Sequence, residues 1–259
     1  MAVFGFSAGD MDNYSDLNRQ LDGDTDCHIF DSIPSTNDYL LSLEFSPRVQ
    51  ICIASEQTQG KGQHNRAWLS NKDSSVLLSV RRVFPIDVNL SGLSLVIGLA
   101  ILEVLEDYGA SGLQLKWPND VYYQDQKLAG ILIKNTVRSQ FQSTVIGIGL
   151  NINVDIDCQT PWTDLHAIST HKDINKFDLT KDLINKVLQF CQVFEAKGFM
   201  YFSQQWANVD YLQGRGVRYS DKKQTFSGIC CGVSDKGVLL VKTKDSIRQI
   251  YSSEFLRLL

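Results

Sequence analysis

The sequence has no long hydrophobic run. Its longest apolar segment, Leu93 to Leu105, is shorter than the roughly eighteen residues that suggest a membrane span, and it contains Glu103. The N-terminal segment, Met1 to Asp26, is acidic and polar and lacks the basic start and apolar centre of a signal peptide. We therefore expect a cytoplasmic protein that does not associate with membranes.

Cysteine and histidine are sparse and are not arranged for chemistry. The four histidines have no metal-ligand spacing, and no Gly-x-Ser-x-Gly elbow or serine–histidine–aspartate order occurs. No two cysteines form a Cys-x-x-Cys pair, and most lie in apolar segments, which predicts reduced, buried thiols. The six cysteines are Cys27, Cys52, Cys158, Cys191, Cys230 and Cys231.

Positive charge is not in excess either. The formal net charge is −4, which argues against a general nucleic-acid binder. With 259 residues, of which 43% are apolar, the chain is long enough for one large domain and a small appendage.

Hydrophobic periodicity predicts the elements of the larger unit. Apolar residues recur at helical spacing from Leu93 to Tyr108, and Ser35 can cap a short helix that ends near Leu43. Two more helices are predicted over 177–196 and 198–208. Alternation and turn residues predict strands over 49–54, 75–82, 113–117, 121–123, 128–134 and 142–151.

The pattern changes near Val209, where short strands broken by glycine and aspartate turns begin. This change predicts a small β-barrel at the C-terminal end. We therefore divide the chain into an irregular lead-in over 1–27, a mixed α/β unit over 28–208 and a C-terminal β module over 209–259.

The polar loop from Glu56 to Trp68 is the first segment with chemical character. The glycines of Gly60-Lys61-Gly62 would let backbone N–H groups approach an anion, and Lys61 and Arg66 add cations suited to phosphate or carboxylate. The loop matches neither a Walker A motif nor a dinucleotide fingerprint. Taken alone, it is more typical of a flexible surface loop.

The segment Lys116-Trp117-Pro118-Asn119-Asp120 is the second. Pro118 ends a strand and Asn119-Asp120 suit a tight turn, from which Asp120 could hold a metal ion or orient a cation beside a phosphate. A plain turn with a solvated aspartate is the alternative.

Lys127 follows at the start of the next strand. A lysine there usually faces solvent, but Gly130 permits a close approach, so Lys127 could also reach inward as a charge clamp.

The strand Val145 to Val154 is the last of these segments. Its glycines, Gly147 and Gly149, suggest that another backbone or a flat ligand lies against them, and Asn151 and Asn153 could present amides to a purine. A core strand that simply contains a glycine bulge is an equally good interpretation of this segment.

Together these segments resemble the catalytic domain of the biotin–protein ligases, over roughly residues 28 to 259. The matching motifs follow the family's order. They are Ser35-Thr36-Asn37, Gln57 to Trp68, Lys116 to Leu132 and Gly147 to Asn153. The resemblance implies an α+β fold with a mixed sheet packed by helices, like that of class II aminoacyl-tRNA synthetases, and a C-terminal SH3-like β-barrel.

The resemblance also implies a role for each matching residue. Those that would bind biotin are Ser35, Thr36, Asn37, Gln57, Gly60, Lys61, Lys127 and Gly130. Those that would bind the nucleotide are Lys61, Arg66, Trp117, Asn119, Asp120, Asn151, Asn153 and Trp162, with Trp162 as an aromatic lid on the adenine and Asp120 also contacting Mg²⁺. Catalysis would depend on Lys127, which would bridge the biotin carboxylate and the α-phosphate, and on Arg66 and Lys116 facing the phosphates.

The implied reaction joins biotin and ATP into biotinyl-5′-AMP and transfers the biotinyl group to a lysine of a carrier protein. The expected partner is the biotin carboxyl carrier protein of acetyl-CoA carboxylase. A homodimer through an exposed sheet edge stays open. Too few residues precede the catalytic unit for the DNA-binding domain of some family members, so DNA binding is not expected.

One departure from the family concerns the first loop. The family often has Gly-Arg-Gly-Arg-Arg-Gly-Arg, whereas Gln63, His64 and Asn65 replace three of those residues here. The loop is therefore less basic, and retention of the adenylate would depend more on Lys61 and Arg66.

Two alternative functions follow from the same motifs. A lipoate–protein ligase or octanoyl transferase shares the fold class, but the transferase needs a cysteine nucleophile, and Cys52 precedes the loop without lying in any of the four motifs. A non-catalytic adenylate sensor could dispense with Lys127 and Asp120, and both are present.

Overall fold

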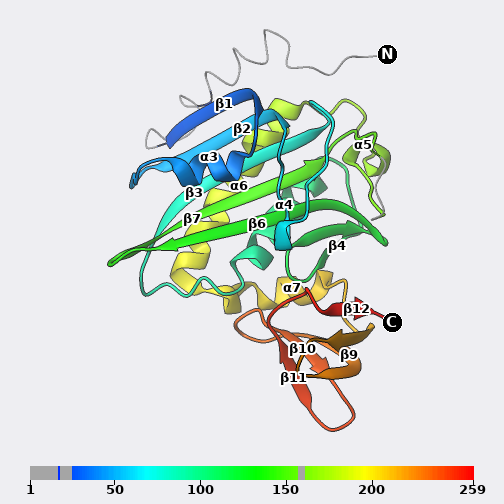
Figure 1. Cartoon of the computed structure of the whole chain (residues 1–259). Helices are drawn as coiled ribbons and strands as arrows, with labels where there is room; N and C mark the ends of the chain where they lie inside the picture. Colours follow the sequence, from blue (N-terminus) through cyan, green and yellow to red (C-terminus); the bar gives the residue numbers. More distant parts are fainter. Residues whose placement is uncertain (1–16, 18–24, 157–160) are drawn as a thin grey trace.

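A mixed sheet of seven strands forms the centre of the larger unit (Figure 1), with strand order β1-β2-β3-β7-β6-β5-β4. Strand β1 runs parallel to β2, and the other neighbours are antiparallel. The computed structural model describes residue 17 and residues 25–156 and 161–259. The strands are β1 (Thr25–Ile33), β2 (Val49–Gln57), β3 (Ser75–Pro85), β4 (Leu113–Lys116), β5 (Asp120–Tyr123), β6 (Gln126–Val137) and β7 (Phe141–Asn151).

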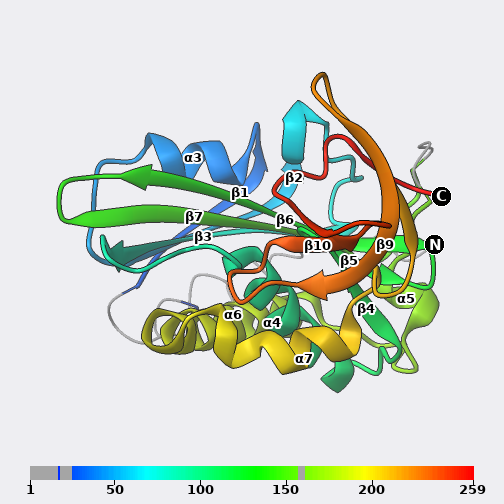
Figure 2. The ribbon, with the colours of Figure 1, turned by 90° about the horizontal axis from the view of Figure 1, so that it is seen from below.

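Helices cover the two faces of this sheet unequally (Figure 2). The short helix α3 (Thr36–Ser42) lies on one face, against β2, β3 and β7. The long helices α4 (Leu93–Asp107) and α6 (Lys176–Lys197) pack on each other and cover the opposite face. The face that carries α3 is therefore left partly open beyond the helix. The remaining helical segments are the 3₁₀ turn η1 (Gln63–Asn65), α5 (Leu165–Ile168), the 3₁₀ turn η2 (Phe199–Phe202) and α7 (Ser203–Val209).

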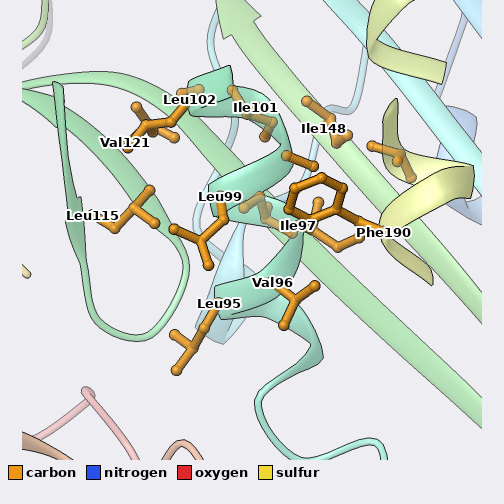
Figure 3. Close-up of a cluster of buried hydrophobic side chains, with 14 of the residues drawn as sticks. Leu95, Val96, Ile97, Leu99, Ile101, Leu102, Leu115, Val121, Ile148 and Phe190 are labelled. Carbon is orange, nitrogen blue, oxygen red and sulfur yellow. The ribbon is translucent and has the colours of Figure 1, made fainter. Parts of the chain in front are cut away.

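The side chains of β7 point alternately into the core and toward the open face, because successive side chains of a strand point to opposite faces. Ile146, Ile148 and Leu150 are buried in the main core, where Ile148 lies near α4 and Phe190 of α6 (Figure 3). The intervening Gly147 and Gly149 face the other way, toward α3. The glycines thus leave room on the open face while the branched residues fill the core.

The C-terminal module is an antiparallel sheet of five strands in the order β11-β10-β9-β8-β12. It lies at the β4 and α7 end of the larger unit (Figure 1). The turn at Gly237 docks there: its carbonyl accepts a hydrogen bond from Trp117 Nε1 at 3.0 Å, and a Cβ on it would lie 2.8 Å from the Cα of Gly92. The strands are β8 (Gly216–Ser220), β9 (Thr225–Val233), β10 (Leu239–Lys242), β11 (Ile247–Ile250) and β12 (Leu256–Leu258).

Most of the predicted elements are confirmed, and so is the α+β fold with its C-terminal β module. The predicted helix over 198–208 is divided, because it begins as the 3₁₀ turn η2 and continues as α7. Strand β1 was not predicted. The irregular lead-in over 1–27 lies largely outside the described residues, but Leu17 is fully buried and β1 already begins at Thr25. Cys158 also lies outside the described residues.

None of the described helices is both long enough and apolar enough to cross a bilayer.

Leu99 tests the packing of α4 on the sheet. Its side chain is 1% exposed, so Leu99→Ala should lower the free energy of unfolding by about 2–5 kcal/mol through lost burial and a residual cavity. Urea unfolding would measure this. Leu41→Ala, at a leucine that is 39% exposed on α3, is the matched control, and equal losses in both variants would contradict the packing.

Candidate functional site

A cavity of about 760 Å³ lies on the open face of the sheet and extends to the C-terminal module. Its size is in the range of small-molecule sites, which is roughly 300–1,000 Å³. Every residue that the sequence analysis assigned to a site lies on its wall except Gly60 and Asn153. The motifs are far apart in the sequence but meet in one place.

Helix α3 forms one end of the cavity. Ser35 caps the helix by accepting a hydrogen bond from Asp38 N, and Thr36 donates to Gln57 Oε1 from both its backbone N (2.8 Å) and its hydroxyl (3.0 Å). Asn37 donates to the Leu132 carbonyl at 3.1 Å. These contacts fix a set of hydroxyl and amide groups that can hydrogen-bond a small polar ring.

Ser79 on β3 hydrogen-bonds to the side chains of Thr36 and Asn37, and the sequence analysis did not identify it. Its Oγ lies 2.7 Å from both Thr36 Oγ1 and Asn37 Oδ1. Ser79 is a fully buried hydroxyl on β3, among the apolar residues Leu77, Leu78 and Val80. A serine with apolar residues on both sides in a buried strand is the signal that could have identified it.

The two glycines of β7 lie directly beneath side chains of the same protein. A Cβ on Gly147 would lie 2.5 Å from Asn37 Oδ1, and one on Gly149 would lie 2.5 Å from Trp68 Cε2. Gly130, the register partner of Gly149 on β6, lies under the same indole. The sequence analysis expected another backbone or a flat ligand against these glycines, whereas side chains of the protein itself lie there, and Trp68 packs its loop onto the sheet.

The loop that carries Trp68 is closed by its own backbone. Trp68 N donates to the Gly60 carbonyl at 2.9 Å, Gly62 N donates to the Arg66 carbonyl at 2.7 Å, and His64 has a left-handed φ of 54°. A Cβ on Gly60 would lie 2.7 Å from the Trp68 carbonyl oxygen, so Gly60 serves this close approach and lies behind the cavity wall. Lys61 and Arg66 both line the cavity.

Lys127 lines the cavity from the start of β6. Its Nζ lies 2.7 Å from Asp120 Oδ1 and 5.6 Å from the centre of the Trp68 ring system. Its backbone is paired with the segment around Trp162, because Lys127 N donates to the Pro161 carbonyl and Thr163 N donates to the Lys127 carbonyl, both at 3.0 Å. The predicted inward lysine and the predicted lid residue therefore lie side by side.

The residues predicted to bind the nucleotide differ in whether they reach the cavity and in whether their polar groups already have a partner. Asn151 is buried on the cavity wall, where Nδ2 donates to the Thr163 carbonyl and Oδ1 has no partner among the described residues. Asn153, which lies beyond the end of β7, is exposed and does not line the cavity. Trp117 reaches the wall, but its indole N–H is used by Gly237. Asn119 Nδ2 donates to the Ile131 carbonyl.

Lys116 places a partly buried positive charge at the β4 end of the cavity. Lys116 Nζ lies 3.2 Å from the Tyr122 hydroxyl, and burial lowers the pKa of its ammonium group, an effect that nearby Asp120 opposes. Burial also raises the pKa of the Tyr122 phenol. A partly desolvated ammonium group at a cavity wall suits an anionic ligand.

Residues of the C-terminal module complete the wall, and the sequence analysis did not find them. Ser253, Leu256, Arg257 and Leu258 contribute from or near β12. His64 of the loop lies 3.7 Å from Glu254 of this module. No local motif marks these residues, because only the docking of the module brings them to the cavity.

Comparison with known proteins agrees with these observations. Residues 29–151 match the biotin/lipoate A/B protein ligase family, and residues 213–258 match the biotin protein ligase C-terminal domain. The bifunctional ligase/repressor BirA of Escherichia coli is 32% identical over 243 residues, which cover 91% of this chain and 75% of that protein. A biotin–[acetyl-CoA-carboxylase] ligase of Mycobacterium tuberculosis is 35% identical over 150 residues, covering 54% of each chain.

Among solved structures, a biotin protein ligase from Aquifex aeolicus in complex with biotin and ATP is similar throughout. It superposes with a TM-score of 0.76 at 28% identity, covering 90% of this chain and 99% of that one.

Gly149→Ala tests the seating of Trp68. The added methyl would displace the indole at a cost of about 1–3 kcal/mol, so the loop should open more often. We expect trypsin to cleave after Lys61 and Arg66 at least about fivefold faster, since cleavage follows the open population. Gly216→Ala, where a Cβ meets only ordinary contacts, is the control. Unchanged cleavage of the Gly149→Ala variant would show that the indole does not depend on this glycine.

Proposed function

The chain belongs to the biotin–protein ligase family, and we propose that it activates biotin with ATP and transfers it to a lysine of a biotin carboxyl carrier protein. The observation that carries this proposal is the position of Lys127. In the sheet order, Lys127 on β6 lies between β7, against which α3 packs, and β4, which ends at Lys116, and its backbone pairs with Trp162. Such an order suits a small acid that meets a nucleotide at one central cation.

The proposed ligand positions follow the chemistry of each wall. The ureido ring of biotin would lie among Ser35, Thr36, Asn37 and Gln57, which hydrogen bonds hold in fixed orientations. The free Oδ1 of Asn151 is an acceptor that suits the amino group of adenine. Trp162 would then cover the base.

The first chemical step needs no protein nucleophile. A carboxylate oxygen of biotin attacks the α-phosphorus of ATP, the bond to the β-phosphate breaks, and pyrophosphate leaves with the bonding electrons. Lys127 would reduce the repulsion between the carboxylate and the α-phosphate and stabilise the charge of the transition state. Asp120, 2.7 Å from Lys127 Nζ, would keep that ammonium group oriented.

In the second step the neutral amine of the carrier lysine attacks the acyl carbon of biotinyl-5′-AMP, and AMP leaves. The site would act by holding the mixed anhydride and excluding water. Lys61 and Arg66 on the closed loop are the cations available to retain its phosphate.

A magnesium ion fits this arrangement only together with ATP. The described residues contain no group of three or more histidine, cysteine, aspartate or glutamate side chains that could hold a metal alone. Magnesium is commonly bound by one or two carboxylates and substrate phosphates, so Asp120 with the phosphate oxygens would suffice. The ion would compensate phosphate charge.

An acyl transferase that uses a cysteine is the other candidate reaction, and the surroundings of Cys52 weigh against it. Cys52 is fully buried and does not line the cavity. Burial raises the pKa of its thiol, with a smaller contribution from Cys27, so little thiolate would form near neutral pH.

Lys127→Ala tests the proposed mechanism. Removal of the central cation should lower biotin-dependent pyrophosphate release by about 10²-fold or more. The assay contains Mg-ATP, a carrier domain and either biotin or octanoate, and it follows pyrophosphate and the mass of the carrier. Lys134→Ala, on the exposed part of the same strand, should retain activity. Use of octanoate in place of biotin, or full activity of Lys127→Ala, would contradict the proposal.

A further inference from the structure

Lys116 differs from the other lysines of the cavity in its surroundings. Lys127 pairs with Asp120, and Lys61 pairs with Asp38. Lys116 forms no ion pair with any carboxylate in the part of the chain that the structure describes, although it is half-buried at the cavity wall. Its positive charge is therefore not neutralised by direct contact and can act on an anionic ligand.

Two tyrosines hold this ammonium group instead. Lys116 Nζ donates to the Tyr122 hydroxyl at 3.2 Å and lies 4.5 Å from the centre of that ring. It also lies 5.4 Å from the ring centre of Tyr211, and the two rings are 5.0 Å apart. Aromatic faces attract a cation without neutralising it, and each such contact contributes on the order of 0.5–2 kcal/mol.

Hydrogen bonds of both its backbone and its hydroxyl group hold Tyr211 in place. Its backbone N donates to the Leu115 carbonyl at 3.0 Å, immediately before Lys116. Its hydroxyl donates to Asp125 Oδ1 at 2.7 Å, and the guanidinium of Arg215 lies 3.9 Å from its ring centre. Burial and the bond to Asp125 raise the pKa of Tyr211 to about 12, so the phenol keeps its proton. Tyr211, which lies between α7 and β8, therefore supplies one of the two aromatic rings around Lys116.

The sheet order indicates which part of a ligand Lys116 would meet. Helix α3 lies over β2, β3 and β7, Lys127 is the second residue of β6, and Lys116 ends β4 at the edge of the sheet. A ligand that extends from α3 past Lys127 would therefore bring its far end to Lys116. In the proposed reaction, the group beyond the reacting α-phosphate is the pyrophosphate that leaves.

We propose that Tyr122 and Tyr211 are positioning residues that hold Lys116 on the departing pyrophosphate, so that this trio serves adenylation and not transfer. The inference rests on the proposed function. In adenylation Lys116 offsets the charge that develops on the β-phosphate as its bond to the α-phosphorus breaks. In transfer the pyrophosphate has already left, and AMP is the leaving group.

Separate assays of the two half-reactions test this assignment on the full chain. The first measures kcat and KM for ATP in biotin-dependent pyrophosphate release. The second measures single-turnover transfer from synthetic biotinyl-5′-AMP to a carrier domain. Tyr211→Leu and Tyr122→Phe should each lower kcat/KM for ATP by about 2–30-fold, the equivalent of one weakened cation contact. Transfer should stay within about twofold of wild type.

Two further variants separate positioning from a general structural effect. In a Lys116→Ala background, Tyr211→Leu should cause no further loss, because the residue it positions is gone. Tyr219→Leu is the matched control: Tyr219 stacks on Phe226 and donates to Asp221 in the C-terminal module, away from Lys116. It should leave both half-reactions unchanged. Tyr122→Phe decides the question if Tyr211→Leu does not fold.

Several results would contradict the positioning role of the two tyrosines. Equal losses in adenylation and transfer, or an undiminished effect of Tyr211→Leu in the Lys116→Ala background, would overturn the positioning role. So would wild-type kcat/KM for ATP in both tyrosine variants. If the wild type itself releases no biotin-dependent pyrophosphate, the proposed function fails, and this assignment fails with it.

Discussion

The ion pair between Lys127 and Asp120 is the contact around which the cavity is arranged. Asp120 opens β5 and Lys127 lies at the start of β6, so the tight β5–β6 hairpin brings the two side chains to 2.7 Å. The same lysine is paired through its backbone with the segment around Trp162, and Trp68 packs above the neighbouring Gly130. A single hairpin therefore sets the positions of a cation, a carboxylate and two aromatic side chains. The two side chains are 25% and 22% exposed, so the pair stays accessible from the cavity.

Small residues on one face of the sheet provide the space that this arrangement needs. Ser79, Gly147 and Gly149 lie on the face that carries α3, while their strand neighbours fill the core on the other face. Any side chain at either glycine would displace Asn37 or Trp68. The stability of the core and the shape of the site thus depend on alternate positions of the same strands.

The sequence predicts local features well and distant contacts poorly. The periodic segments gave α4, α6 and most of the strands, and the motifs around Ser35, Lys116 and Lys127 do meet in one cavity. Strand β1 escaped prediction because its residues, Thr25–Ile33, alternate only weakly between apolar and polar. The contribution of Tyr211, Ser253 and Arg257 depends on how the C-terminal module docks, and no spacing in the sequence encodes that. Asn153 shows the converse: a motif residue can lie just beyond the strand end and miss the wall.

Docking of the C-terminal module also fixes the β4 end of the cavity, since Trp117 bonds to Gly237 and Tyr211 lies against Lys116. In the proposed mechanism, Lys127 is the cation shared by the acid and the nucleotide. A crystal structure of the chain with biotinyl-5′-AMP bound would test this role. We expect Lys127 Nζ within hydrogen-bonding distance, about 2.7–3.2 Å, of oxygens at the acyl phosphate junction, with the biotin ring at α3. An adenylate bound elsewhere, with Lys127 contacting only Asp120, would contradict it.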